Sequence, residues 1–444
     1  MLKKLNGADD MTGAEVAIRN AEFPVPFVSG LEYNAPARGP WNIVHTGMLI
    51  PESHQVFACA QGCLRGVILT AAEMIAMDRM SWISVDQNDL FDGSLERNIV
   101  DGTAEIIRKL PKKPRALLLF ISCVHLFAGC DFEVMLNELR AMFPDIDFID
   151  CYMNPTMRKS GLTPDQLMRR QLYAPFMPCP ADRDAVNLIG NDRPTDESSE
   201  LVQLIKNAGR ELRDITLCGT YDEYMRMAKS ALNITYLPTA AASGDALEKR
   251  LGRKHLYLPL SYDLDEIERN LNTLADALGI AAPDWTDAKQ NTIRALEQAK
   301  AVIGDTPVEI DYTATPRPVG LAALLAGHGF RVTRVYTDAM IEEERPAFER
   351  LRELAPDLLL TATVNVKMRF AGKGVHESGD VLAIGQKAAY FSGTKHFVNI
   401  VSGGGMYGFD GIARLAHLMT EAAAHEQDTE VVIQYKGLGC RSCL

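Results

Sequence analysis

The sequence predicts an α/β protein with three Rossmann-like domains, each built on a parallel sheet flanked by helices. Two observations support this fold class. Short, β-prone apolar runs alternate with amphipathic helical stretches along most of the chain, a pattern typical of parallel sheets. A chain of 444 residues is also too long for one hydrophobic core and should divide into several units. Strand-to-helix turns recur at comparable places in three sets of elements, without a repeat that proves duplication.

The expected domains follow one another along the chain. Residues 1–40 are polar and contain proline and glycine, which predicts an extended N-terminal arm. The three α/β domains are expected at 41–182, 183–285 and 286–425. Residues 426–444 form a C-terminal tail with a C-x-x-C motif.

Each domain is expected to alternate strands with helices. In the first, strands are predicted near 56–58, 80–85, 116–121 and 146–150, and helices near 63–77, 95–109 and 130–142. In the second, strands are predicted near 215–218, 233–237 and 255–258, and helices near 197–208, 221–231 and 244–251. In the third, strands are predicted near 308–312, 331–336 and 357–360, and helices near 318–328 and 342–354. Pro318 suits the first turn of its helix.

Composition excludes several classes of function. The formal net charge of −12, with no basic stretch to offset it, argues against a nucleic-acid-binding protein. The longest apolar runs, such as 116–121, are far shorter than the ~20 residues of a membrane span. The N-terminus lacks the apolar region of a signal peptide, so we expect a cytoplasmic protein. In that reducing compartment, nine cysteines are metal ligands, reactive thiols or core residues and not disulfides.

Three cysteines carry the most information. Cys59 and Cys63 follow one apolar, β-prone run, and Cys123 follows another; an amphipathic helix comes after each group. Parallel strands would deliver these thiols to one carboxyl edge, where α/β folds bind ligands. Cys151 closes a third such strand. Soft thiolates suit iron–sulfur clusters or zinc. The alternative is that they are ordinary buried cysteines, which we favour only for Cys218.

Two other segments invite a ligand-binding interpretation. The glycine-rich stretch 403–411 lacks the spacing of a nucleotide-binding motif, so it is either a loop close to a cofactor or neighbouring subunit, or a tight turn that needs positive φ. The turn at 312–318 places an arginine at a helix N-terminus. Either an anion site or simple helix capping explains it.

The sequence resembles the component 1 family of nitrogenase-type oxidoreductases from about residue 41 to residue 421. Cys63 in Q-G-C stands where that family has H-G-P-x-G-C. Cys123, before A-G-C-D, matches the family's strand–x-C-P segment, and Cys151 lies where the family's next strand ends. The segments D-Y-T-A-T-P-R-P-V-G and G-M-Y-G-F-D-G resemble the strand-turn-helix and the late turn of the third domain.

This resemblance implies an iron–sulfur electron-transfer oxidoreductase. A [4Fe–4S] cluster would be held by Cys59, Cys63 and Cys123, with its fourth ligand from Cys151, the tail, a partner or a non-cysteine group. An ATP-dependent iron protein would supply electrons, and the substrate is not identified. The chain would pair with itself or with a sister subunit. His125, two residues past Cys123, is either a donor near the cluster, an alternative ligand or a satisfied histidine.

The departures from the family are equally informative. The cluster cysteine that nitrogenase subunits carry well upstream of Cys63 is missing, and Cys59 appears instead. The ligands of the nitrogenase metallocluster would fall near Gly244-Asp245 and Val398, none of which is a ligand, so no such metallocluster is expected. The alternative function is therefore a scaffold for cluster or cofactor assembly, without turnover of its own.

The C-terminal Cys440 and Cys443 have no counterpart in these families. They would be extra cluster ligands, a zinc clasp or a redox pair, or have no structural role. A third interpretation of the whole chain, a zinc-stabilised binding protein of periplasmic type, fits the domain count but not the placement of the cysteines.

Overall fold

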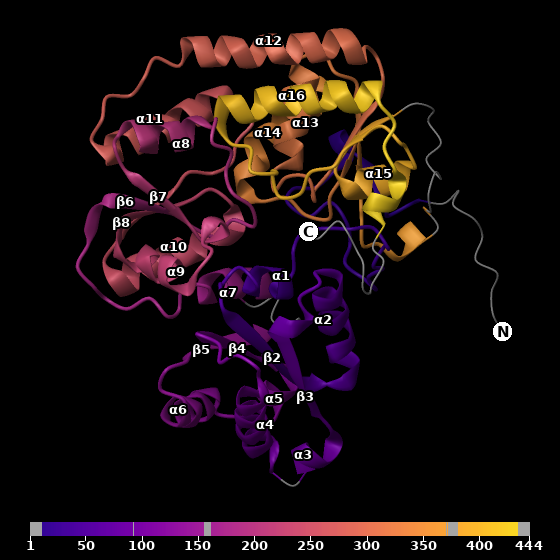
Figure 1. Cartoon of the computed structure of the whole chain (residues 1–444). Coiled ribbons are helices and arrows are strands. Elements are labelled where there is room, and N and C mark those ends of the chain that lie inside the picture. The colour runs from indigo at the N-terminus through magenta and orange to yellow at the C-terminus, as the bar shows by residue number, and fades with distance from the viewer. Residues whose placement is uncertain (1–10, 92, 155–160, 370, 372–380, 434–444) are drawn as a thin grey trace, which may run out of the picture. The chain divides into compact units, whose positions relative to one another are not determined.

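The structure is a computed structural model that describes residues 11–91, 93–154, 161–369, 371 and 381–433. It contains three sheets, and helices flank them (Figure 1). The described residues form two compact units. Unit 1 comprises residues up to 40, 195–208 and 259–433, and unit 2 comprises 41–194 and 209–258. The predicted α/β class with parallel sheets is confirmed.

The first sheet of unit 2 has the order β3-β2-β4-β5, and all its pairs are parallel. Its strands are β2 (Ser53–Ala60), β3 (Met80–Val85), β4 (Ala116–Ser122) and β5 (Asp147–Met153). Its helices are α1 (Ile43–Gly47), α2 (Gln61–Glu73), α3 (Gln87–Phe91), α4 (Leu95–Lys109), α5 (Cys123–Phe127) and α6 (Phe132–Met142). β2 and β4 are almost entirely buried on both faces, as the continuous apolar runs in their sequences predict.

The two faces of this sheet pack into two separate cores. Phe57, Cys59 and Phe120 lie in the core that includes α2, whereas Val56 and Ala58 lie in the core on the other face. The alternation follows from the two-residue period of a β-strand. This alternation therefore shows on which face of the sheet each residue at its carboxyl edge lies.

The second sheet of unit 2 has the order β7-β6-β8-β9 and is also parallel. Its strands are β6 (Asp182–Leu188), β7 (Glu211–Asp214), β8 (Ser230–Thr235) and β9 (Lys254–Tyr257). The helices of this region are α7 (Pro164–Gln171), α9 (Tyr221–Arg226) and α10 (Ala241–Leu251). The strand predicted at 215–218 is wrong: the strand ends at Asp214, and a 3₁₀ helix spans Ile215–Leu217. Asp214 accepts a hydrogen bond from the Thr216 N–H (2.8 Å), which turns the chain.

Unit 1 is built on the third sheet, with the order β1-β12-β11-β10-β13-β14. Its strands are β1 (Glu15–Ala17), β10 (Val308–Asp311), β11 (Val332–Tyr336), β12 (Leu359–Thr361), β13 (Leu382–Ile384) and β14 (Phe397–Val398). Its helices are α8 (Glu200–Asn207), α11 (Leu264–Leu278), α12 (Thr286–Ile303), α13 (Pro318–Gly327), α14 (Arg345–Leu354), α15 (Gln386–Ser392) and α16 (Gly408–Ala424). α12 and α16 lie side by side (Figure 1).

Unit 1 has two local features besides its parallel strands, an antiparallel edge strand and a tight glycine-rich turn. β1 lies within the predicted N-terminal arm and pairs with β12 in the antiparallel sense. In the glycine-rich loop, Ser402, Gly403, Gly404 and Gly405 all have positive φ, as a tight turn requires.

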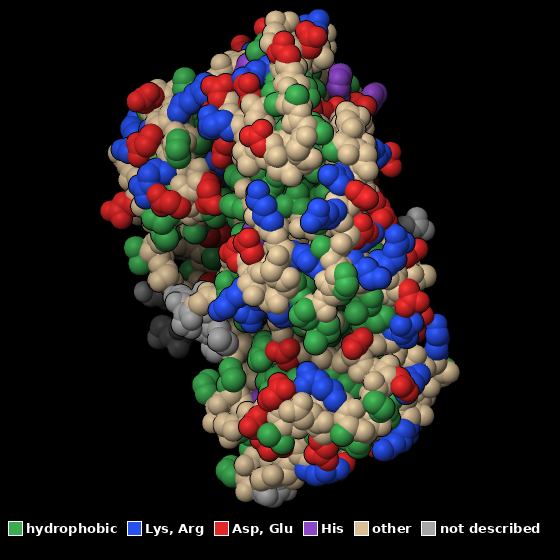
Figure 2. All heavy atoms as spheres, turned by 90° about the vertical axis from the view of Figure 1, so that its left-hand side faces the viewer, with side chains coloured by type: hydrophobic (Ala, Val, Ile, Leu, Met, Phe, Trp, Pro, Cys, Tyr) green, Lys and Arg blue, Asp and Glu red, His purple; other side chains and the backbone are tan. Residues whose placement is uncertain are grey.

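Surface charge is mixed on the face shown in Figure 2. Lys and Arg side chains lie interspersed with Asp and Glu side chains there, unlike the basic stripe of a nucleic-acid-binding face. No helix of the described residues is long and apolar enough to cross a membrane.

Candidate metal centre

The structure places Cys59, Cys63 and Cys123 at the carboxyl edge of the first sheet. Cys59 is the last residue but one of β2, and Cys63 lies in the first turn of α2. Cys123 begins α5, directly after the last residue of β4. Cys59 is buried, Cys123 is half-buried and Cys63 is exposed. The edge thus presents thiols from two neighbouring strands, one of them open to an incoming group.

Cys63 and Cys123 lie close enough to Cys59 for their charge to affect its thiol. The pKa of Cys59 is raised to about 12, first because burial disfavours the thiolate and then because negative charge on Cys63 and Cys123 repels it. A thiolate on the buried Cys59 is therefore disfavoured unless a positive charge lies beside it. A cationic iron–sulfur core supplies that charge, so the donor set fits such a cluster.

Among the residues that the structure describes, no three His, Cys, Asp or Glu side chains gather as they would around one metal ion. Two thiolates on a single zinc lie at most about 4.6 Å apart, twice the Zn–S bond of ~2.3 Å. The ligands of a multi-iron cluster are held by different irons and stand further apart.

Cys151 is not brought to this group. It lies on β5 opposite Phe120, which in turn lies opposite Phe57, so it is one row deeper in the sheet than Cys59. Two strand spacings of ~4.8 Å and two residues of ~3.3 Å place its Cα roughly 12 Å from that of Cys59. It is fully buried, and burial raises its pKa well above the usual value. Its surroundings are those of a core residue.

His125 is buried and organises the start of α5. The backbone N–H of Ser122 donates to its Nδ1 (3.1 Å), and burial lowers its pKa. Its Nε2 is buried and makes no hydrogen bond within the described part of the chain. Nδ1 also lies 3.2 Å from the Ser122 carbonyl oxygen, so the ring is anchored at the start of α5, two residues from Cys123.

The remaining cysteine predictions fall elsewhere. Cys440 and Cys443 lie outside the described residues. The thiol of Cys218 donates to the Asp214 carbonyl oxygen (3.3 Å) in unit 2, and burial raises its pKa to about 11. Cys218 is therefore a suitable control for experiments on the other thiols.

The carboxyl edge of the second sheet is closed by a histidine. The His255 ring takes the space beside Gly244, because a Cβ on Gly244 would lie 2.1 Å from Nε2. Thr235 Oγ1 contacts that Nε2 (2.7 Å) and Asp245 Oδ1 contacts Nδ1 (2.9 Å). Both ring nitrogens are thus occupied by the chain itself.

The carboxyl edge of the third sheet holds a buried lysine that the sequence did not single out. Lys387 is 6% exposed, and burial lowers its pKa. The negative charges of Asp311 and Asp338 act in the opposite direction and raise it. Within the described residues no carboxylate lies in ion-pair distance of its ammonium group. Asp311 is itself occupied as the cap of α15, accepting from the Ala388 N–H (2.6 Å). A buried cation of this kind favours an anionic neighbour.

The predicted anion site at 312–318 is filled by the protein. Glu344 accepts hydrogen bonds from the N–H groups of Val319 (2.7 Å) and Gly320 (3.1 Å) at the start of α13. Arg317 is paired with Glu266 (2.9 Å). Helix capping, one of the two explanations left open by the sequence, therefore accounts for this turn.

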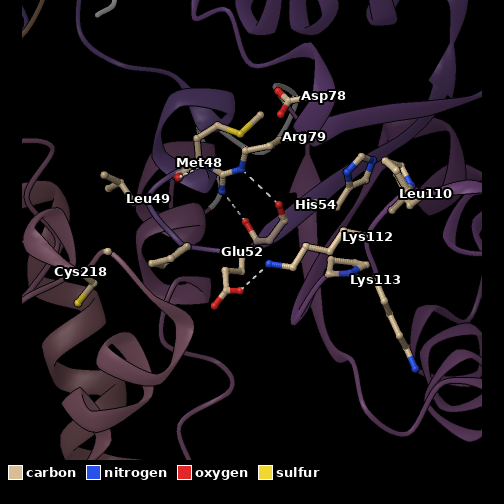
Figure 3. Close-up of a pocket in the computed structure, with 15 residues that line it drawn as sticks. Met48, Leu49, Glu52, His54, Asp78, Arg79, Leu110, Lys112, Lys113 and Cys218 are labelled. Carbon is tan, nitrogen blue, oxygen red and sulfur yellow. Dashed lines mark hydrogen bonds and ion pairs between the residues drawn. The ribbon is translucent and has the colours of Figure 1, made fainter.

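An open cavity of about 470 Å³ lies at the opposite, amino edge of the first sheet (Figure 3). Arg79 donates to the carbonyl oxygens of Ile50 (2.7 Å) and Met48 (3.1 Å), and Lys112 pairs with Glu52 (3.1 Å). Its cations are thus already engaged, and ligands of parallel α/β sheets bind at the carboxyl edge. We do not place chemistry in this cavity.

Comparisons with known proteins identify the family and the fold of the chain. The family model described as nitrogenase component 1 type oxidoreductase matches residues 44–423. Two solved structures have this fold. "Nitrogenase Cp1 at pH 6.5" has a TM-score of 0.67 and 14% identity, covering 89% of this chain and 94% of its own. "Nitrogenase Cp1 at pH 5" has a TM-score of 0.56 and 11% identity, covering 93% and 94%. No curated protein matches the sequence. Because the family model spans most of its length, the chain belongs to the nitrogenase component 1 type oxidoreductase family.

Proposed function

We propose that this chain is the cluster-bearing, electron-accepting subunit of a two-component reductase. One observation supports the proposal: in a member of this family, Cys59, Cys63 and Cys123 lie at the carboxyl edge of the same sheet. Cys59, Cys63 and Cys123 would hold a [4Fe–4S] cluster, which supplies one-electron transfer at low potential when bound. The substrate that receives the electrons is not identified.

The chain's own residues would tune this site. Burial of Cys59 keeps water from one side of the thiol group. His125, whose buried Nε2 makes no hydrogen bond within the described residues, lies two residues from Cys123. Hydrogen bonds and burial around cysteine ligands set the potential of such centres. The exposed Cys63 leaves the opposite side accessible.

Residues near the carboxyl edge of the first sheet also support the proposal of an oligomer. Exposed apolar side chains lie on two helices that follow strands of this sheet, namely Leu90 and Phe91 on α3 and Leu126 and Phe127 on α5. Phe91 and Phe127 are 86% and 78% exposed. Large exposed apolar side chains of this kind favour a protein–protein interface. We propose that a second component 1 subunit, either another copy or a sister chain, covers them.

The electron donor is proposed to be a separate ATP-dependent iron protein, and both components would work in the cytoplasm. Electron transfer falls off steeply with distance, so the donor must dock near the thiol edge. The test is to purify the protein without oxygen and to measure iron, acid-labile sulfide and the EPR spectrum of the reduced protein. We expect iron and sulfide in equal amounts, and their loss in Cys123→Ala but not in Cys218→Ala.

Two outcomes would contradict the proposal: zinc in place of iron, or full iron content in Cys123→Ala. Light scattering tests the oligomer, since a clean monomer at the chain mass of 48.9 kDa would exclude it. Transfer of the cluster to an acceptor protein, without ATP-dependent reduction of any substrate, would favour an assembly scaffold instead.

A further inference from the structure

We infer that Glu200 is a pH-sensitive switch that controls the glycine-rich loop 402–408. Its carboxyl group holds the loop and the start of α16 when it is protonated, and its hold weakens when it ionises. All the residues involved lie in unit 1. The inference therefore goes beyond the proposed function and does not depend on a cluster in unit 2.

The glycine-rich loop lies at the carboxyl edge of the third sheet. It follows β14, and its first N–H groups bind the turn after β10. The N–H of Ser402 donates to the Thr313 carbonyl oxygen (2.8 Å). The N–H of Gly403 donates to the Ala314 carbonyl oxygen (2.7 Å). Because α/β folds bind ligands at this edge, a shift of the loop would change access to it.

The segment that leads into α8 holds the other end of the loop. The N–H of Asp196 donates to the Gly405 carbonyl oxygen (2.9 Å). The hydroxyl group of Ser199, which is fully buried, donates to the Tyr407 carbonyl oxygen (3.1 Å). Glu200 is the first residue of α8, and α8 packs against α11 and α16 (Figure 1). The loop is thus fixed between the turn after β10 and the start of α8.

The carboxyl group of Glu200 lies where the loop enters α16. Its Oε1 accepts the N–H of Asp410 (2.9 Å) in the first turn of that helix. Its Oε2 takes the space beside Gly408, where a Cβ would collide with it. This Oε2 is buried and makes no hydrogen bond within the described part of the chain. One oxygen is therefore satisfied and the other is not.

An unsatisfied, buried carboxyl oxygen disfavours ionisation. Burial raises the pKa of Glu200 from 4.5 to about 7, and the negative charge of Asp410 adds to the rise, although backbone N–H groups act to lower it. The folded chain therefore keeps a proton here that the unfolded chain loses near pH 4.5. The stabilising effect of this contact is complete below that pH and is lost as pH rises to about 7.

The other charged groups of this region are already engaged. Arg414 on α16 pairs with Asp196, and Lys206 on α8 pairs with Glu197 (3.2 Å). Within the described residues no cation pairs with Glu200. Ion pairs on α11 join Glu266 to Arg317, and Asp265 and Glu268 to Lys289. The remaining titratable residues of the two helices that pack on α8 are Arg269 and Asp276 on α11, and His417 and Glu421 on α16.

Glu344 provides a matched comparison within unit 1. It also caps a helix, α13, and burial raises its pKa to about 7 as well. However, the positive charge of Arg317 favours its ionised form, whereas the negative charge of Asp410 disfavours that of Glu200. Glu344 is therefore held in either protonation state, and Glu200 is not.

The experiment uses the full chain with Trp285 as a reporter. The ring centroids of Trp285 and Phe409, in the first turn of α16, lie 6.1 Å apart. Trp41→Phe and Trp82→Phe leave Trp285 as the one tryptophan of the chain. Between about pH 6 and 8 its emission should shift to longer wavelength, with a midpoint near the pKa of Glu200. Hydrogen exchange of residues 402–411, corrected for its intrinsic pH dependence, should rise several-fold over the same range.

Glu200→Gln should abolish both changes, because the amide does not ionise, and Glu344→Gln in the same background should keep them. Asp410→Asn should move the midpoint to lower pH, because it removes the neighbouring negative charge. This second variant tests the switch even if Glu200→Gln does not fold. The inference is overturned if emission and exchange stay constant across the range, if Glu200→Gln retains their change, or if Asp410→Asn leaves the midpoint where it was. Loss of the transition in Glu344→Gln would assign it to the cap of α13 instead.

Discussion

The carboxyl edges of the two sheets in unit 2 are both formed by parallel strands, but different side chains lie at each edge. At the edge of β3-β2-β4-β5, thiols and a hydroxyl remain open, with Cys63 and Ser84 exposed. At the edge of β7-β6-β8-β9, His255 fills the space beside Gly244 and both its nitrogens contact neighbouring side chains. Polar groups at one edge are exposed, whereas the chain itself fills the other.

This difference shows how a family fold changes function locally. The strands and crossover helices position a site at each edge, but a few side chains decide whether the site stays open. The nitrogenase metallocluster would take a cysteine near Gly244, and here an imidazole stands in the space that its Cβ needs. The fold alone therefore does not imply nitrogenase chemistry.

The largest expected effect comes from two buried cysteines on the same face of one sheet. Cys59→Ala should remove most of the iron, because it deletes one of the proposed cluster ligands. Cys151→Ala should keep the iron and lower the free energy of unfolding by about 1 kcal/mol, the usual cost of a small cavity in a core. Iron analysis and urea unfolding measure both. Loss of iron in Cys151→Ala would show that the thiol one row deeper reaches the cluster after all.

The closed edge can be tested by overpacking. Gly244→Ala should destabilise the protein by about 1–3 kcal/mol, because its Cβ would lie 2.1 Å from the His255 ring. Adding His255→Ala should relieve much of this cost, so the two changes should not be additive. Gly66→Ala in α2 is the control.

Gly66 has open space around its Cβ position and an ordinary helical place, so the same substitution there should be neutral or stabilise by about 0.5–1 kcal/mol. Denaturant unfolding gives all four values. Additive effects of Gly244→Ala and His255→Ala would mean that the ring does not occupy this space.

A third prediction concerns Asp214, which ends the edge strand β7 of the closed sheet. It is 2% exposed, and burial raises its pKa from 3.8 to about 7, although the hydrogen bonds from Thr216 act to lower it. Between these two values the native carboxyl keeps a proton that the unfolded one has lost. The native state therefore binds more protons, and the free energy of unfolding falls as pH rises from about 4 to 7.

Asp214→Asn keeps the acceptor for the Thr216 N–H and removes the ionisation. Its stability should depend less on pH in that window, by on the order of 3 kcal/mol, at about 1.4 kcal/mol per pKa unit. Burial also raises the pKa values of Glu344 and Glu200 to about 7. These two groups therefore keep part of the pH dependence of stability in both the variant and the wild type. Parallel stability curves for variant and wild type from pH 4 to 7 would show that Asp214 is ionised in the native state.

Hydrophobic periodicity was enough to predict the sheets and the thiol edge, whereas contacts between side chains far apart in the sequence were missed. The apolar runs before Cys59 and Cys123 were sufficient to place both at one sheet edge. The β-branched Ile215 and Thr216 suggested a strand, but the Asp214 side chain turns the chain there. Two contacts leave no local pattern in the sequence. Glu344 caps α13 from 25 residues beyond Val319, and His255 fills the space beside Gly244. Tertiary contacts of this kind override local preference.

The smallest expected effect lies at the rim of the open edge. Arg65 is exposed two residues beyond Cys63 on α2, near the place where an iron protein must approach. Rim charges act mainly on association rates, and salt screens them. Arg65→Glu should therefore slow ATP-dependent reduction of the cluster several-fold at low salt, while its reduction by dithionite and its iron content stay unchanged. Lys109→Glu, at the C-terminal end of α4, is the control because that end leads to the amino edge of β4. Equal loss by both reductants would indicate a structural role for Arg65, and unchanged ATP-dependent reduction would place the docking face elsewhere.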